Sequence, residues 1–337
     1  MKRVLLTGGC GYIGSHALIQ LLEKGYEVAV IDSLINSEKD SLDRIESFFK
    51  VQIPFLQNNF IDDLDEASKF IREFNPNFIM HFAGLKSVAE SVKKPILYWE
   101  QNVVSTVNLV KILQSLENEL SIIFSSSATI YKESNDGYFE ENSPLKPISP
   151  YGITKLTIEK VLSTLVENSQ NFSAVSLRYF NPVGASRKAL TCENPLNIPN
   201  NIMPRLVQSA LSNEKKFTIF GNDYDTHDGT CIRDYIHIDD LVKGHIKAMN
   251  VLSKTHLHHK LNLGTGNGVS VAEIVESFES SNNIKFNISV SSRRPGDIQS
   301  SKANPSYAKK LINWEAKKTL DDMCKDSWDV YNAIYNN

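Results

Sequence analysis

Residues 4–15 read VLLTGGCGYIGS, and the chain's architecture follows from this stretch. Its apolar start predicts a buried strand, and apolar residues at three- and four-residue spacing after it predict a helix. Gly8, Gly11 and Gly14 fall in the turn between the two. Such a turn lets backbone N–H groups approach a pyrophosphate at the helix N-terminus, where a side chain would hold the phosphates away. The stretch therefore predicts the first unit of a dinucleotide-binding sheet.

Asp32 stands at the end of the next strand-like run, 18 residues beyond Gly14. A carboxylate at this place accepts a hydrogen bond from a ribose 2′-hydroxyl and repels a 2′-phosphate. NAD is therefore the predicted cofactor, in preference to NADP. The alternative is a strand-turn-helix unit whose glycines serve turn geometry only.

Strand-like and helical stretches alternate through the first half of the chain. This alternation predicts an α/β fold, a Rossmann-type doubly wound parallel sheet. Beyond residue 180 the periodicity becomes less regular and turn-rich. We therefore expect an NAD-binding domain over 1–180 and a smaller C-terminal substrate-binding α/β domain over 181–337, with some segments of the second packing back on the first.

The bulk composition narrows the class of ligand. The 337 residues carry 36 Lys and Arg against 39 Asp and Glu, a net charge of −3. This balance gives no field for nucleic acid or an anionic membrane surface, so any polyanion bound should be small and held by a few placed cations. The four cysteines are far apart and form no metal-ligand pattern, which predicts no metal and a reducing compartment. We expect no signal peptide, no membrane span and a cytoplasmic protein.

A candidate catalytic group follows an apolar strand. Pro150 is suited to the first turn of a helix, which would put Tyr151 and Lys155 on one helical face. Ser127, near the end of the strand before them, is placed to contact the same substrate oxygen. The Tyr/Lys spacing alone should occur roughly once by chance in such a chain, so the surrounding motifs must support it. His81 is expected to be a structural histidine.

Isolated arginines in the second half suggest a diphosphate site. Arg233 and Arg294 are far apart in sequence, and guanidinium groups are suited to bidentate contact with phosphate. Surface ion pairs are the alternative for both. The apolar helical stretch over residues 88–116 predicts either a dimer interface or plain packing against the sheet.

Seven motifs spread over essentially the whole chain match one known family. They are Thr7–His16, His81–Lys86, Phe124–Thr129, Tyr151 with Lys155, Arg178–Ala185, Phe220–Tyr224 and Arg233–His237. Together they resemble the UDP-glucose 4-epimerase family of extended short-chain dehydrogenases/reductases. The resemblance implies interconversion of UDP-glucose and UDP-galactose through a transient 4-keto sugar, with bound NAD, in a homodimer.

The resemblance also implies roles for individual residues. Tyr151 would be the base at the hexose 4-hydroxyl, Lys155 would bind the nicotinamide ribose and keep the phenol ionised, and Ser127 would aid proton movement. Activity at neutral pH then requires that Lys155 and the cationic nicotinamide lower the pKa of Tyr151 by about three units. The implied cofactor-binding residues are Gly8, Gly11, Tyr12, Ile13, Gly14, Asp32, Asn59, Phe82, Ala83, Gly84, Lys86, Asn102, Tyr151, Lys155 and Tyr179. The implied substrate-binding residues are Ser127, Tyr179, Asn181, Asn200, Asn201, Phe220, Arg233, Arg294, Asp297 and Ser301.

Three positions depart from the family pattern. Asn59 stands where an Asp usually meets the adenine amino group, and Lys132 replaces a usual glycine. Ser301 lies where a bulky Tyr occurs in members restricted to the plain hexoses, so the small residue predicts room for a 2-acetamido group. Activity on UDP-N-acetylglucosamine and its galacto epimer is therefore expected as well, and such a sugar or a uronate as the main substrate is an alternative.

Two further alternatives concern the reaction class. A nucleotide-sugar dehydratase would need an acid pair where Ala128 and Thr129 stand. A non-catalytic NAD sensor would keep the glycine turn without needing Tyr151, Lys155 and Ser127, all of which are present.

Overall fold

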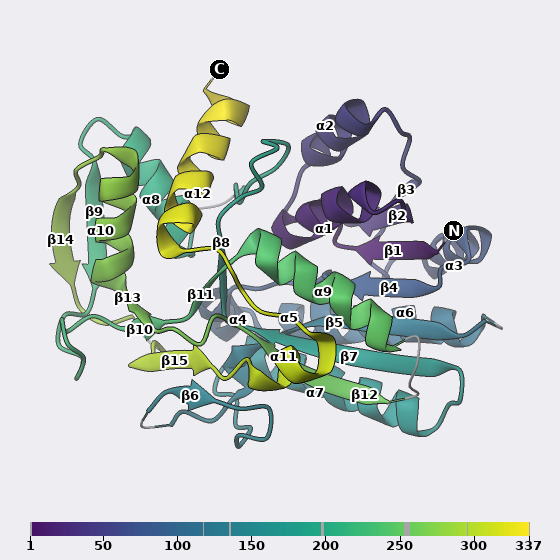
Figure 1. The fold of residues 1–337 in the computed structure, drawn as a ribbon. Helices are drawn as coiled ribbons and strands as arrows, with labels where there is room; N and C mark the ends of the chain where they lie inside the picture. The colour runs from purple at the N-terminus through teal and green to yellow at the C-terminus, as the bar shows by residue number, and fades with distance from the viewer. Residues whose placement is uncertain are drawn as a thin grey trace.

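The computed structural model describes residues 2–116, 118–134, 136–196, 199–252, 257–294 and 296–336. Its largest element is a seven-stranded parallel sheet in the order β12-β7-β5-β4-β1-β2-β3 (Figure 1). The strands are β1 (Arg3–Thr7), β2 (Glu27–Asp32), β3 (Phe55–Gln57), β4 (Phe78–His81), β5 (Leu120–Ser127), β7 (Phe172–Tyr179) and β12 (His258–Leu263). The order reverses between β1 and β4, and sheets of this kind bind ligands outside the carboxyl ends of their strands at such a point. The predicted doubly wound sheet is confirmed.

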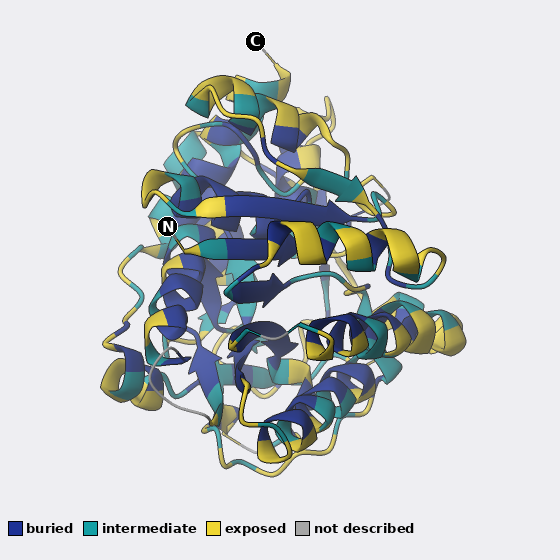
Figure 2. Ribbon diagram, turned by 90° about the vertical axis from the view of Figure 1, so that its right-hand side faces the viewer, coloured by how far each residue is buried: buried dark blue, intermediate teal, exposed yellow. Residues whose placement is uncertain are grey.

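Helices cover both faces of this sheet because successive strand residues point to opposite sides. Val4 and Leu6 of β1 join one apolar cluster and Leu5 joins the other. The first face is covered by α1 (Tyr12–Glu23), α2 (Asp40–Phe49), α9 (Ile238–Leu252) and α11 (Ser306–Ile312). The second is covered by α3 (Leu64–Phe74), α6 (Ser105–Gln114) and α7 (Pro150–Glu167). Figure 2 shows the result, with dark strands between helices whose outward faces are yellow.

The remaining short helices precede or follow these elements. They are α4 (Val88–Lys93), α5 (Pro95–Tyr98), the π-helical turn η1 (Trp99–Val104) that leads into α6, and the 3₁₀ turn η2 (Ala128–Ile130). The helical stretch expected over residues 88–116 is therefore built of several joined pieces. Pro95 stands at the start of α5, where its missing N–H costs nothing.

A second lobe is built on smaller sheets around its own apolar cluster. One sheet has the order β13-β10-β15-β6, and two strand pairs, β11-β8 and β14-β9, complete the lobe. Its strands are β6 (Tyr138–Phe139), β8 (Asn181–Val183), β9 (Lys216–Phe220), β10 (Ile232–Arg233), β11 (Tyr235–His237), β13 (Val269–Ser270), β14 (Asn287–Ser291) and β15 (Ser300–Ala303). Its helices are α8 (Ile202–Leu211), α10 (Val271–Asn282) and α12 (Leu320–Tyr335).

The chain crosses between the lobes more than once. After residue 181 it returns to the large sheet, where β12 pairs with β7 and α9 packs near α1. Before residue 180, the chain leaves the large sheet after β5, and β6 pairs with β15 of the second lobe. The boundary between 180 and 181 stays a prediction, since each lobe is assembled from separate segments.

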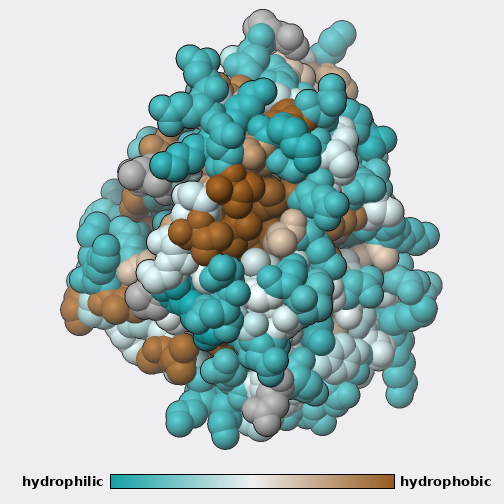
Figure 3. All heavy atoms as spheres, turned by 90° about the vertical axis from the view of Figure 1, so that its left-hand side faces the viewer, coloured by the Kyte–Doolittle hydropathy of each residue, from teal (hydrophilic) through white to brown (hydrophobic). Residues whose placement is uncertain are grey.

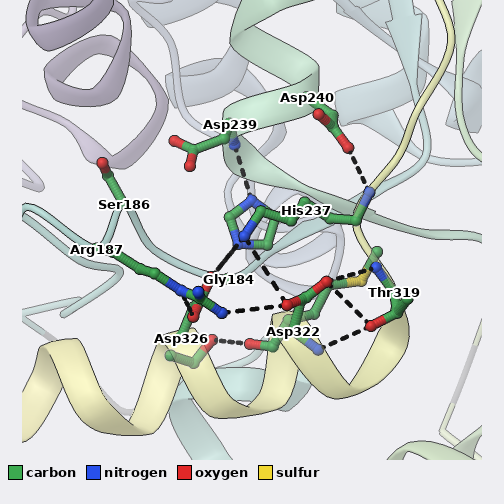
Figure 4. A network of polar contacts seen from close by, with 12 residues as sticks. Gly184, Ser186, Arg187, His237, Asp239, Asp240, Thr319, Asp322 and Asp326 are labelled. Carbon is green, nitrogen blue, oxygen red and sulfur yellow. Dashed lines mark hydrogen bonds and ion pairs between the residues drawn. The ribbon is translucent and has the colours of Figure 1, made fainter.

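A polar network around the buried Asp326 carboxylate holds α12 to the loop after β8 (Figure 4). The Asp326 carboxylate accepts a hydrogen bond from Arg187 Nε at 2.6 Å and lies 3.1 Å from Lys318 Nζ. His237 Nε2 lies 3.3 Å from the same carboxylate. The backbone N–H of Asp239 donates to His237 Nδ1, so the ring hydrogen sits on Nε2 and faces Asp326. The C-terminal helix α12 is thereby connected to His237 of β11 and to Arg187 in the loop after β8.

The surface carries some exposed apolar side chains. Figure 3 shows apolar side chains gathered on the face that carries β9 and β14, where Ile288 and Val290 of β14 are exposed. No helix within the described ranges is long and apolar enough to cross a bilayer.

Candidate active site

The glycine turn between β1 and α1 is packed too closely for side chains. Gly8 has φ +72°, and a Cβ there would lie 2.7 Å from the backbone N of Ala83. A Cβ on Gly14 would lie 2.1 Å from the carbonyl oxygen of Gly8. Gly11 is different, because its Cβ would meet only the Gly8 oxygen, at 3.4 Å. Gly11 caps α1 without a side chain, so the turn presents backbone at the positive end of that helix, as a pyrophosphate site requires.

Tyr12 and Ile13 form the first turn of α1, and the Tyr12 side chain leads to the second lobe. Its hydroxyl donates to the carbonyl oxygen of Gly184 at 2.6 Å. The Lys86 ammonium lies 6.0 Å from the Tyr12 ring centroid. The side chain of Tyr12 therefore connects the glycine turn to the loop after β8.

Asp32 ends β2, where the sequence places it, and its carboxylate is buried. One oxygen accepts from the Cys10 N–H at 2.9 Å, and the other accepts from Leu34 N–H and Ser37 Oγ at 2.9 and 3.0 Å. Because each carboxylate oxygen has two lone pairs, acceptor capacity remains on the oxygen bonded to Cys10. The carboxylate thus fixes the loops on both sides of the predicted ribose site.

The turn after β4 lies against the glycine turn. It contains the predicted cofactor residues Phe82, Ala83 and Gly84, and Gly84 has φ +145°. Asn102 holds this turn from the side, since its Oδ1 accepts from Leu85 N–H at 2.7 Å and its Nδ2 donates to Leu85 O at 3.1 Å. The same amide donates to Thr154 of α7 at 3.1 Å. Asn102 is buried, so it positions the turn as well as the start of α7.

His81 is a structural histidine. Its Nδ1 lies 2.6 Å from Thr7 Oγ1 and its Nε2 lies 2.8 Å from Thr106 Oγ1. Burial lowers the pKa of the ring to about 3, which keeps it neutral. The ring therefore joins β1, β4 and α6 without a free nitrogen for chemistry.

Tyr151 and Lys155 lie on the first turns of α7, as predicted. Ser149 caps the helix by accepting from Gly152 N–H at 3.1 Å, and Pro150 occupies its first turn. The Lys155 ammonium lies 5.7 Å from the Tyr151 ring centroid and donates to Ser125 O at 2.8 Å. The helix therefore brings both side chains to the end of β5.

Ser127 is the last residue of β5 and completes the group. It accepts a hydrogen bond from Thr129 Oγ1 at 3.0 Å, and its hydroxyl acts on the nearby phenol of Tyr151 by lowering the pKa of that phenol. A hydroxyl, a phenol and an ammonium thus meet at the carboxyl edge of the sheet. Such a group can move a proton to and from a substrate hydroxyl.

Burial opposes the lowering of the Tyr151 pKa that catalysis at neutral pH requires. Burial raises the pKa of Tyr151, and the hydroxyl of Ser127 lowers it by less. Burial also lowers the pKa of Lys155 to about 8. The expected lowering of the tyrosine pKa is therefore not produced by the polypeptide alone, because desolvation disfavours both the phenolate and the ammonium.

The predicted diphosphate residues converge on Asp297. Arg294 Nε donates to its carboxylate at 2.9 Å, and Arg233 NH2 lies 3.7 Å from the other oxygen. Arg294 also lies over the Phe220 ring, with 5.5 Å between the guanidinium carbon and the centroid, and donates to Asn200 O at 3.4 Å. Residues from four separate segments thus form one cluster.

Asn201 and Lys86 meet at a residue that sequence reasoning missed. Asn201 Nδ2 donates to Glu193 Oε1 at 2.6 Å, and Lys86 Nζ lies 2.7 Å from the same oxygen. Glu193 stands in an irregular loop with no motif around it, so no sequence signal singles it out. The carboxylate joins a predicted cofactor residue to a predicted substrate residue.

The other predicted residues lie on strands or in turns. Asn59 closes its own turn, accepting from Ile61 N–H at 2.8 Å and donating to Asp62 at 2.6 Å. Asn181 begins β8. Tyr179 ends β7, and burial raises its pKa. Ser301 is buried on β15, directly beside Arg233 of β10.

No group of three or more His, Cys, Asp or Glu side chains is arranged to hold a metal ion within the residues that the structure describes. The four cysteines are free thiols. The donors that meet at the sheet edge are backbone N–H groups, hydroxyls and one ammonium. This set suits an organic dinucleotide, and it fits NAD through the glycine turn that a Cβ would block.

A parallel sheet with this glycine turn, and a Ser, Tyr and Lys group at the carboxyl edge, defines an extended short-chain dehydrogenase/reductase. Comparison with known sequences narrows the class. The sequence profile of the family described as GDP-mannose 4,6 dehydratase matches residues 5–327. The chain is 41% identical to UDP-glucose 4-epimerase 2 of Arabidopsis thaliana, over 97% of this chain and 94% of the plant protein. It is also 41% identical to the bifunctional protein GAL10 of Pachysolen tannophilus, but spans 48% of that protein's length.

Solved structures give the same result. UDP-glucose 4-epimerase of Stenotrophomonas maltophila, with bound NAD and formylated UDP-arabinopyranose, superposes with a TM-score of 0.93 at 37% identity over 99% of this chain and 98% of the other. The Bifidobacterium longum enzyme with NAD⁺ and UDP gives 0.92 at 38% identity, over 98% and 99%. The UDP-Glc/GlcNAc 4-epimerase of Campylobacter jejuni gives 0.82 at 32% identity, over 99% and 100%. The chain belongs to the UDP-glucose 4-epimerase family.

Proposed function

We propose that this protein interconverts UDP-glucose and UDP-galactose by inverting C4 of the hexose, with NAD as its cofactor. One observation carries the proposal: Tyr151, Lys155 and Ser127 meet at the same edge of the sheet as the glycine turn. The cluster of Arg233, Arg294 and Asp297 supports it, because a cationic site is suited to a nucleoside diphosphate. The relatives named above support the substrate and the cofactor.

In the proposed mechanism Tyr151 takes the proton of the 4-hydroxyl and later returns it to the 4-keto oxygen. Lys155 holds its ammonium beside the phenol, where a positive charge favours the phenolate. Ser127, whose hydroxyl lowers the pKa of the phenol, would help the proton move between the phenol and the sugar oxygen. When bound, NAD supplies the hydride acceptor and donor for C4. The glycine turn, Asp32 and Lys155 would hold the cofactor.

Inversion requires that the sugar present both faces to one reaction centre. Arg233, Arg294 and Asn201 lie on elements of the second lobe and would hold the UDP portion. A hexose held mainly through its nucleotide is free to turn about its link to the diphosphate. This arrangement explains why charged residues gather where the UDP portion would bind, while the proton-transfer group lies where the hexose would bind.

Dehydration of a nucleotide sugar is a second candidate reaction, because the matching family profile carries a dehydratase description. Such chemistry needs an acid after the serine of β5, where this chain has Ala128 and Thr129. The Thr129 hydroxyl is already hydrogen-bonded to Ser127. A neutral hydroxyl is a poor general acid near neutral pH. Epimerisation therefore fits the residues better, and a non-catalytic NAD sensor leaves the catalytic group without a role.

The function is tested by incubating the purified protein with UDP-glucose and separating the nucleotide sugars. Formation of UDP-galactose, approached from either substrate, supports the proposal. Formation of a dehydrated UDP-sugar, or no change in a protein that carries NAD, contradicts it.

We infer that Ser301 widens the substrate range to UDP-N-acetylglucosamine and UDP-N-acetylgalactosamine. Ser301 lies beside Arg233 in the sheet register, so its small side chain borders the proposed nucleotide-sugar site. Ser301→Tyr should abolish turnover of the acetamido sugars and preserve turnover of the plain hexoses. Ser301→Ala is the matched control and should turn over both pairs. Equal activity of Ser301→Tyr on both pairs would refute this role.

We infer that the protein forms a homodimer through the joined helices that precede α6. Ile96 is 68% exposed and Val92 is 64% exposed, and Trp99 and Val104 are exposed on the same run. Exposed apolar side chains gathered on one run are typical of interfaces. Ile96→Glu should give a monomer by light scattering, and Ile288→Glu on β14 should not. We also infer a cytoplasmic location, which the free thiols support.

A further inference from the structure

Arg205 of α8 stands beside the predicted nucleotide site, although no motif points to it. Its guanidinium carbon lies 4.9 Å from the Phe220 ring centroid and 5.7 Å from that of Phe217. Phe220 is also the ring over which Arg294 lies, at 5.5 Å. Two guanidinium groups therefore share one aromatic ring of the proposed UDP site.

Arg205 has no anionic partner in the part of the chain that the structure describes. Within those ranges no carboxylate and no carbonyl oxygen accepts a hydrogen bond from its guanidinium, and its contacts are the two aromatic rings. Burial lowers its pKa, and the positive charge of Arg294 lowers it further. Like charges held close together in a half-buried place are unfavourable unless an anion compensates them.

The charges of the cluster are unbalanced in a way that matches a diphosphate. Asp297 is shared by Arg294 at 2.9 Å and Arg233 at 3.7 Å, so one carboxylate serves two arginines. With Arg205 added, the cluster holds three cations and one anion and has a net charge of plus two. A nucleoside diphosphate linked to a sugar carries one negative charge on each phosphate. Its charge would therefore neutralise the cluster.

We propose that Arg205 is a third arginine of the diphosphate site, and that its guanidinium binds a phosphate of the nucleotide from the side of Phe220. This assignment deepens the proposed function and rests on it. The aromatic ring holds the planar guanidinium in a fixed orientation, as cation–π contacts do. Arg205 is thereby positioned before the nucleotide arrives, which reduces the entropy lost on binding.

The test compares the binding of UDP and uridine to Arg205→Gln by calorimetry. UDP affinity should fall about tenfold, with uridine affinity unchanged, because uridine lacks the phosphates. The salt dependence of UDP binding should also decrease, since one charge pair is lost. Arg205→Lys keeps the charge without the planar group and should lie between wild type and Arg205→Gln.

Arg293→Gln is the matched control. Arg293 also lies over an aromatic ring, 4.0 Å from the Tyr224 centroid, but it is paired with Asp223 at 2.8 Å and is exposed. Its removal should leave UDP affinity unchanged. Unchanged UDP affinity in a folded Arg205→Gln, or equal losses for UDP and uridine, would overturn the proposal, as would a wild-type protein that does not bind UDP. A wild-type protein that binds UDP through Arg205 but epimerises no UDP-hexose would refute the proposed function alone.

Discussion

Glu159 of α7 and Arg178 of β7 form a fully buried, two-pronged ion pair. Arg178 Nε donates to one carboxylate oxygen at 2.9 Å and NH2 donates to the other at 2.7 Å. Glu159 follows Tyr151 and Lys155 at the same four-residue spacing, so the three side chains lie on one face of the helix. The ion pair therefore fixes how far along the sheet the helix lies, and with it the position of Tyr151 beside Ser127.

Glu159→Gln should lower the free energy of unfolding by roughly 3–5 kcal/mol, because it leaves the Arg178 charge buried without its partner. Denaturant titration measures this loss. Glu167→Gln, an exposed residue at the end of the same helix, is the control and should change stability little. Equal stabilities of the two variants would mean that the pair does not position α7.

Two glycine variants separate folding from cofactor binding. Gly14→Ala should destabilise the protein, because its methyl group would lie 2.1 Å from the Gly8 oxygen. Gly11→Ala should fold with near wild-type stability, since its methyl group meets only that oxygen at 3.4 Å. Its methyl group would nevertheless obstruct the approach of a pyrophosphate to α1, so NAD affinity should fall at least about tenfold. Calorimetric NAD binding and thermal unfolding together check both expectations, and full NAD affinity in Gly11→Ala would contradict the assigned site.

The stability of the link between α12 and the loop after β8 should depend on acid. Burial alone would raise the pKa of Asp326, but interactions with His237, Arg187 and Lys318 outweigh it and lower the pKa to about 2. Because the folded-state pKa lies below the unfolded value, the contribution is present above pH ~4 and is lost as the pH falls toward ~2. Asp326→Asn should therefore cost on the order of 2 kcal/mol near pH ~7, with a difference from wild type that shrinks below pH ~4.

Unfolding free energies of wild type and Asp326→Asn between pH ~7 and ~3 measure this dependence. Asp329→Asn on the same helix is the control, because Asp329 is exposed and forms a surface ion pair with Lys325. A difference between wild type and Asp326→Asn that stays constant over this range would contradict the account.

Local patterns in the sequence predict the framework of the site. The glycine turn, the acid at the end of β2 and the Tyr151/Lys155 pair each depend on residues close together in the chain, so spacing alone reveals them. The convergence of Arg233 and Arg294 on one site was also expected, and the structure shows that Asp297 joins them. The affinity of isolated guanidinium groups for phosphate suggested that expectation and the family resemblance supported it, whereas local spacing does not bring the two arginines together.

Partners that lie far apart in sequence could not be predicted. Arg187 and Asp326 are separated by 139 positions, and Glu193 stands in a loop without a motif. The proposed role of Arg205 depends on its contact with Phe220 and on the nearby Arg294, which belong to other segments of the chain. The opposing effect of burial on the Tyr151 pKa could not be predicted either, because spacing does not report burial.

Turnover of UDP-glucose by Tyr151→Phe, measured with NAD bound, tests the central claim most directly. Tyr98→Phe is the matched control. The Tyr98 ring contacts the Tyr151 ring edge-on, with 6.5 Å between the centroids, while its hydroxyl accepts from Ser87 N–H and donates to Glu90. We predict that Tyr98→Phe forms UDP-galactose, and that Tyr151→Phe retains NAD and loses at least about a hundredfold in rate. A Tyr151→Phe variant that epimerises UDP-glucose at the wild-type rate would contradict the role of Tyr151 as the base at the 4-hydroxyl.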